Sequence, residues 1–168
     1  MHSKSYRFLT PLIMVLTWAN MEAQTSHPVP RLVVNVTIDQ LRTDYMEAFS
    51  SLFGAGGFNK VMRDGRSYMD AAYPFSHIDR ASAVACIMTG TVPYDNGIVG
   101  EHWMDRKTLR PMYCVDDATC EGWLTSEKYS PVALNVSTVT DELKMATGGR
   151  ALVYSIAPDA DAAILAAG

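Results

Sequence analysis

The sequence predicts an α/β protein with a mostly parallel sheet, because two apolar runs are separated by segments with helical spacing. Residues 32–39 read Leu-Val-Val-Asn-Val-Thr-Ile-Asp, and residues 151–157 form a second apolar run. β-Branched side chains suit a pleated strand. Runs that are apolar on both faces are typical of parallel strands covered by helices. We therefore expect a layered α/β domain built around these two strands.

The other elements follow from apolar spacing and from turn residues. Asp79 is a natural N-cap for a helix that begins at the next residue, and the Gly148-Gly149 pair is a natural C-cap for a later helix. Pro74 ends a further predicted strand, over residues 67–73. The predicted elements are helices over 41–52, 58–63, 80–88 and 137–147, a strand over 67–73, a surface loop or small hairpin over 100–120, and a polar turn over 158–161.

Composition narrows the class of protein. The chain has 168 residues, of which 48% are hydrophobic and 19% are charged, with a formal net charge of −4. These values are ordinary for one globular domain at most. The sequence contains no basic cluster, so we predict no nucleic-acid-binding surface. The apolar stretch at 162–168 has no polar tail, and we expect the chain to be the N-terminal part of a larger domain.

The first residues have the pattern of an export signal. Lys4 and Arg7 precede an apolar segment over 8–19, and Ala23 offers a small residue for cleavage. The apolar segment is shorter than the roughly 20 residues that a membrane-spanning helix needs. We predict that residues 1–23 are a signal peptide, with cleavage after Ala19 as the alternative. The mature chain, 24–168, would then be periplasmic or secreted, with no transmembrane segment.

Export permits disulfide bonds, and the chain has three cysteines. Cys114 and Cys120 flank a short polar loop, so we predict a disulfide between them. Cys86 lies in an apolar helical run and is expected to be a buried thiol. The cysteines and the four histidines do not form a zinc-ligand motif by their spacing.

Asp39 is the first candidate functional residue, because it ends the first predicted strand. In open α/β sheets, ligands bind just beyond the carboxyl ends of the strands. Asp39 is also well placed to cap the helix that follows, since aspartate is a favoured N-cap. Position alone does not separate these two roles, and one carboxylate can fill both.

Several spaced motifs together resemble the alkaline phosphatase superfamily. They are Asp39 after the first strand, Gly57-Phe58 opening a helix with Asp64-Gly65 behind it, Tyr73-Pro74, Thr89-Gly90-Thr91, Pro93 and Asn96-Gly97-Ile98. The nearest branch resembles the secreted bacterial phosphomonoesterases and the type I phosphodiesterase/nucleotide pyrophosphatase group. The similarity runs from about Arg31 to Gly168. It implies the N-terminal part of an alkaline-phosphatase-like layered sandwich.

The resemblance also implies an activity, a cofactor and a substrate class. Family members hydrolyse phosphate mono- or diesters, usually with two zinc ions, so a small-molecule phosphoester would be the substrate. Asp39 matches the family's first metal ligand. Two metal ions can activate a nucleophile and stabilise the leaving oxygen of an in-line displacement. The family's later aspartate and histidine ligands have no match within these 168 residues.

This sequence departs from the family where the nucleophile is expected. Counting back nine residues from Thr89-Gly90 reaches Arg80, where the resemblance implies a threonine or serine. A guanidinium stays protonated in proteins and does not attack phosphorus as an alkoxide would. Ser82, two residues later, is the alternative nucleophile, although a small residue there also suits packing against the sheet. Asp79 is expected to line the same pocket.

Three further positions change in the same direction. The resemblance implies a phosphate-binding asparagine at Glu101, a lysine at Asp159 and an arginine at Asp161. Carboxylates that lie close together are costly unless they bind cations or take up protons. The sequence therefore leaves two functions open. One is an exported, metal-dependent phosphoester hydrolase; the other is a catalytically inactive superfamily member that binds a ligand or a protein in the periplasm.

Overall fold

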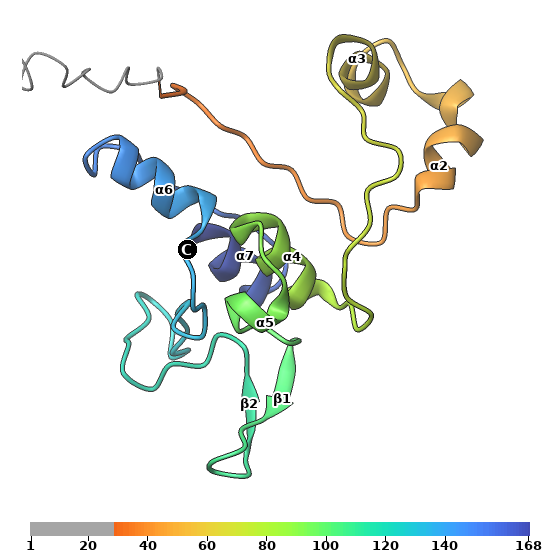
Figure 1. The fold of residues 1–168 in the computed structure, drawn as a ribbon. Helices are drawn as coiled ribbons and strands as arrows, with labels where there is room; N and C mark the ends of the chain where they lie inside the picture. The colour runs from red at the N-terminus through yellow and green to blue at the C-terminus, as the bar shows by residue number, and fades with distance from the viewer. Residues whose placement is uncertain (1–28) are drawn as a thin grey trace, which may run out of the picture. The chain divides into compact units, whose positions relative to one another are not determined.

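The computed structural model describes residues 29–168. The chain divides into two units, Met1–Val33 and Val34–Gly168, and all the elements of regular structure described below belong to the second. These elements, in chain order, are α2 (Thr43–Ala48), η1 (Ser50–Leu52), α3 (Gly57–Asp64), α4 (Arg80–Thr89), α5 (Pro93–Asn96), β1 (His102–Met104), β2 (Pro111–Tyr113), α6 (Val139–Ala146) and α7 (Ala160–Ala167) (Figure 1).

The hydrophobic core is built around α4 and α7, which pack against each other (Figure 1). Alanines on α4 allow a close approach, and Ala81 and Ala85 are fully buried. Leu165 on α7 is also fully buried. The buried hydrophobic residues of this core are Ala81, Val84, Ala85, Met88, Ile98, Cys114, Val115 and Leu165. The core therefore holds α4 and α7 against each other.

Two glycines end short elements of this unit in the left-handed conformation. Gly90, with φ +69°, is the C-cap of α4, and its amide donates to the Cys86 carbonyl. Gly97, with φ +86°, is the C-cap of α5. A Cβ at position 97 would lie 2.5 Å from Asn135 Nδ2 and 2.7 Å from the Ala133 carbonyl oxygen. Gly97 is thus required both for backbone conformation and for close packing.

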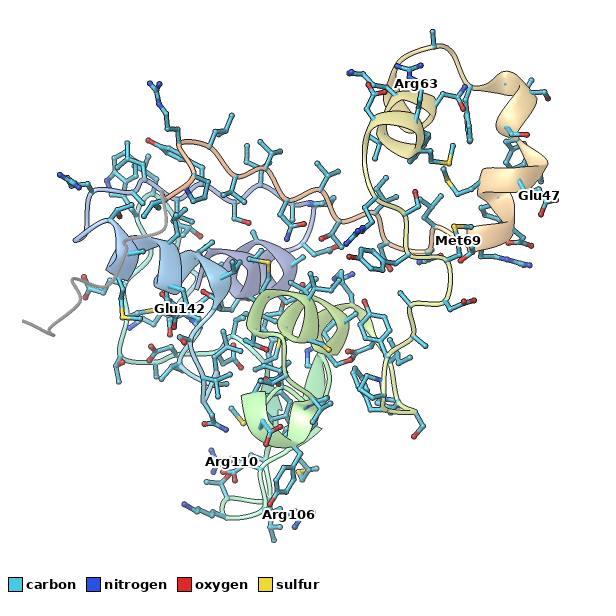
Figure 2. All side chains as sticks on the ribbon, turned by 45° about the horizontal axis from the view of Figure 1, so that its top comes forward. Glu47, Arg63, Met69, Arg106, Arg110 and Glu142 are labelled. Atoms are coloured by element: carbon cyan, nitrogen blue, oxygen red, sulfur yellow. The ribbon has the colours of Figure 1, made fainter. Side chains whose placement is uncertain are left out.

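A two-stranded antiparallel hairpin follows α5, as the prediction of a loop or small hairpin over 100–120 allowed. His102 pairs with Tyr113, Trp103 with Met112, and Met104 with Pro111. The connecting loop carries Arg106 and Arg110 (Figure 2). This hairpin is the one sheet among residues 29–168.

The helix predictions are confirmed to within a few residues, but the strand predictions are not met. Residues 32–38 and 151–157 have no ladder partner among the described residues, and neither do residues 67–73. Their large side chains are exposed instead, as at Val34, Leu152 and Ile156. A strand is defined by hydrogen bonds to its neighbours, and an apolar run alone does not supply them. The mostly parallel sheet is therefore not confirmed by this structure.

Two other predictions are corrected near the core. The predicted polar turn over 158–161 is shorter than expected, because α7 begins at Ala160 with Asp159 as its N-cap residue. Cys114 and Cys120 are free thiols, so the predicted disulfide is wrong. Cys114 is buried in the core, where burial raises its pKa to about 12. The Cys120 Sγ instead lies 3.3 Å from the carbonyl oxygens of Asp117 and Tyr129, which share its single hydrogen.

The predicted signal peptide, 1–23, lies outside the described residues. Within residues 29–168, no helix combines the length and the apolar character needed to cross a bilayer.

Candidate functional site

The N-terminal end of α4 is held by a reciprocal capping box. Asp79 Oδ1 accepts from the Ser82 amide at 2.9 Å, and Ser82 Oγ accepts from the Asp79 amide at 3.0 Å. The Ser82 hydroxyl also donates to Asp79 Oδ1 at 2.7 Å. Burial acts to raise the pKa of Asp79, but hydrogen bonds from Ser82 and from the Glu101 amide leave it lower than usual. The carboxylate form of Asp79 thus stabilises the start of α4.

Asp79 also ties the segment before β1 to α4. Its Oδ2 accepts from the Glu101 amide at 2.6 Å. A Cβ at Gly100 would lie 3.0 Å from the same oxygen, so a glycine allows this close approach. Glu101 is therefore placed beside the first residue of α4, although it lies more than 20 positions further along the chain.

Arg80, the first residue of α4, makes a two-point contact with Asp161 in the first turn of α7. Arg80 Nε donates to Asp161 Oδ2 at 3.1 Å, and a terminal nitrogen donates to Oδ1 at 3.0 Å. The Asp161 side chain is fully buried, whereas 26% of the Arg80 side chain is exposed. The hydrogen bonds to Asp161 raise the pKa of Arg80. The guanidinium is therefore permanently charged and engaged, and it cannot act as a base or a nucleophile.

Two further carboxylates complete the surroundings of Arg80. Asp159 lies 3.0 Å from one terminal nitrogen and Glu101 lies 3.5 Å from the other. The side chain of Asp159 is 50% exposed and that of Glu101 is 39% exposed. We call Arg80, Glu101, Asp159 and Asp161 the Arg80 cluster. One cation and three carboxylates give the cluster a formal charge of −2.

Tyr113, on β2, is a neighbour of the cluster that the sequence did not single out. Its hydroxyl oxygen accepts from the Asp161 amide at 3.2 Å. The ring stacks on His102, with 4.8 Å between ring centroids. Burial, together with the charge of Asp161, raises the pKa of Tyr113 to about 12. A lone tyrosine in a short strand carries no sequence signal for such a contact.

Ser82, the alternative nucleophile, is brought into the same region but is fully buried. Its hydroxyl is used in the capping box with Asp79. An attacking oxygen must reach a substrate atom at about 3–3.5 Å. The observed position thus gives Ser82 a structural role at the start of α4.

Asp39 lies at the end of the first extended segment and is exposed. Burial raises the pKa of Tyr73, with smaller contributions from the charges of Cys86 and Asp39. In the same segment, the side-chain Nδ2 of Asn35 donates to Met88 Sδ on α4 at 3.0 Å. Residues 29–168 contain no group of three or more histidine, cysteine, aspartate or glutamate side chains that could hold a metal ion. Asp39 alone does not fit a binuclear zinc site, which needs several ligands for each ion.

Comparison with known proteins now gives the class and the family. Several curated relatives are named alkaline phosphatases, and one from Myroides odoratus, 34% identical over 142 residues, is named a calcium-transporting ATPase. The family described as Type I phosphodiesterase / nucleotide pyrophosphatase matches residues 33–164. The chain belongs to this family, within the alkaline phosphatase superfamily.

The similarity covers most of this chain but a minor part of each relative. Alkaline phosphatase PhoV of Synechococcus elongatus is 39% identical over 142 residues, which are 83% of this chain and 26% of the relative. Alkaline phosphatase PafA of Elizabethkingia meningoseptica is 31% identical over 166 residues, 96% of this chain and 30% of the relative. The chain thus spans less than a third of the length of these relatives.

Solved structures agree with the sequence comparison. A crystal structure of wild-type PafA matches with a TM-score of 0.72 and 30% identity, over 84% of this chain and 28% of the other. A PafA variant substituted at a threonine, an asparagine, a lysine and an arginine matches with a TM-score of 0.71 and 33% identity. The fold is therefore of the α/β type found in this alkaline phosphatase.

Proposed function

We propose that the full-length protein is an exported, metal-dependent hydrolase of phosphate mono- or diesters. The observation that carries this proposal is the family match over residues 33–164, together with the structural similarity to an alkaline phosphatase. Zinc ions would activate a nucleophile and stabilise the leaving oxygen. This chain would contribute Asp39 as one metal ligand, and the remaining ligands would come from other parts of the protein.

The start of α4 would line the pocket in this proposal. Asp79 holds the end of the helix in place and positions the Glu101 amide beside it. The guanidinium of Arg80 is paired with Glu101, Asp159 and Asp161, so each of its nitrogens already has a carboxylate partner. The chain's own residues thus shape and orient the pocket wall but do not offer an exposed hydroxyl nucleophile in the Asp79–Ser82 region.

The first test is the metal content of the full-length protein. We expect about two zinc ions per chain in the wild type and their loss in Asp39→Asn. The matched control is Asp44→Asn, which makes the same change at an exposed carboxylate on α2. Wild-type protein without bound metal would refute the metal-dependent hydrolase. Full retention of zinc in Asp39→Asn would refute the role of Asp39 as a ligand.

The second test is turnover of p-nitrophenyl phosphate and bis(p-nitrophenyl) phosphate by the zinc-loaded protein. If the enzyme is active, Ser82→Ala decides whether this hydroxyl attacks phosphorus. We expect turnover to be retained, apart from a loss that follows weakened capping of α4, because Ser82 is buried. Loss of turnover in a variant that is folded and zinc-loaded would restore Ser82 as the nucleophile.

A second candidate function is a catalytically inactive superfamily member that binds a ligand or a protein in the periplasm. The observation that favours it is Arg80, which stands in the expected nucleophile position and is enclosed by three carboxylates. Folded, zinc-loaded protein that turns over neither ester would favour this candidate. Turnover of either ester would exclude it.

A further inference from the structure

The N-termini of α4 and α7 come together at the Arg80 cluster. Arg80 opens α4, and Asp161 lies in the first turn of α7. Helix N-termini carry unpaired amides and partial positive charge, and they attract anions. Asp79 is the N-cap of α4, and Asp159 is the N-cap residue of α7. Carboxylates of the chain itself therefore already stand at both positively polarised ends.

The polar atoms of this region are satisfied within the protein. Among residues 29–168, every buried side-chain nitrogen and oxygen has a hydrogen-bond partner. The fully buried Asp161 uses both oxygens on Arg80. The groups that solvent reaches are mainly the carboxylates of Asp159 and Glu101, which are more exposed than Arg80. An approaching anion would thus meet negative charge before it met the guanidinium.

We propose that the Arg80 cluster is a filled anion site, in which Asp159, Asp161 and Glu101 take the position of an external anion and exclude phosphate. Arg80 then acts as a structural cation that joins α4 to α7. This inference rests on the proposed function, which places the substrate pocket at the start of α4, and it adds which residues of that pocket do not bind phosphate. A phosphoester in this pocket would be bound by groups other than the guanidinium of Arg80.

The positions substituted in the PafA variant can be compared with those of the Arg80 cluster. Its substituted threonine and asparagine lie 21 positions apart, and its lysine and arginine lie two apart. Arg80 and Glu101 have the first spacing, and Asp159 and Asp161 have the second. At these spacings PafA has two neutral and two cationic residues, whereas this chain has one cation and three carboxylates. At Asp159 and Asp161, which the resemblance matches to this lysine and arginine, the sign of the charge is reversed.

The test is binding of inorganic phosphate to the full-length, zinc-loaded protein, measured by calorimetry. We expect Arg80→Gln to lower the phosphate affinity by much less than about tenfold, through the lost charge alone, because three carboxylates already occupy the guanidinium. Asp159→Lys should tighten binding, because it adds a cation at the exposed rim and keeps the Arg80–Asp161 contact. The combined variant Arg80→Thr, Glu101→Asn, Asp159→Lys, Asp161→Arg should tighten it at least about tenfold, the order of one charge-assisted hydrogen bond.

The matched control is Asp95→Lys, which makes the same charge change at an exposed position of α5. Phosphate affinity that falls tenfold in Arg80→Gln would overturn the inference. So would an Asp159→Lys variant that binds phosphate no more tightly than Asp95→Lys, and this single change decides the question if the combined variant does not fold. Ester turnover is measured in parallel, so that failure of the proposed hydrolase is seen separately from the phosphate measurements.

Discussion

Arg80→Ala should destabilise the full-length protein by about 2–4 kcal/mol. The substitution removes the partner of Asp161, whose side chain is fully buried and accepts two hydrogen bonds from the guanidinium. Removing one member of a buried ion pair costs about 3–5 kcal/mol, because the other charge is left uncompensated. We lower the range because about a quarter of the Arg80 side chain is exposed and water can reach the site. Arg80→Lys keeps the charge but not the two-point geometry, and should cost about half as much.

The measurement is urea unfolding at pH 7, followed by tryptophan fluorescence. Arg42→Ala is the matched control, since Arg42 pairs with Asp44 and both side chains are more than half exposed. An exposed pair contributes about 0–1 kcal/mol, so the control should differ little from wild type. The reasoning is refuted if Arg80→Ala lowers the free energy of unfolding no more than Arg42→Ala does. That result would make the Arg80 cluster a solvated surface contact.

Three further predictions concern stability. Asp79→Ala should lower the free energy of unfolding by about 1–2 kcal/mol through loss of the capping box. Because folding lowers the pKa of Asp79, this contribution is present above about pH 4 and is lost as the pH falls through the folded-state pKa. The unfolding curves of wild type and variant should therefore converge in acid. Gly97→Ala should lower the free energy of unfolding by about 2 kcal/mol or more, because φ of +86° is strained for alanine and its Cβ would lie 2.5 Å from Asn135 Nδ2. We expect a lower midpoint of urea unfolding, and an unchanged midpoint would contradict this. The 168-residue chain alone should melt without a sharp transition, because apolar segments such as 34–38 are uncovered; a cooperative calorimetric peak would show the opposite.

Local signals allowed the helices to be predicted. The helix α4 has an aspartate cap, an alanine-rich interior and a terminal glycine, and these features act within about ten residues of chain. The helix α7 was missed because its residues are almost uniformly small and apolar, so they show no polar face with a period of 3.6. The predicted strands depended on neighbours that the sequence of a single segment does not specify.

The sequence predicted which residues would lie near Arg80 but not how they interact, and their role as a functional site stays a prediction. The family resemblance grouped Arg80 with Glu101, Asp159 and Asp161, and the structure brings these side chains into ion-pairing distance. Spacing along the chain could not show that Asp161 would be fully buried. The contact with Tyr113 also depends on tertiary packing of the hairpin against α7.

The uncovered face of residues 151–157 has a consequence for how the protein is made. Leu152, Tyr154 and Ile156 are exposed at every second position, and the residues between them are partly buried. Such a stripe binds other apolar chains readily until it is covered. The capped helix α4 can form from local signals as soon as it is synthesised. Residues 151–157 stay uncovered until other segments of the protein pack against them. Holding chaperones should therefore act on the newly made protein at 151–157 rather than at α4, and their absence should cause aggregation through this segment.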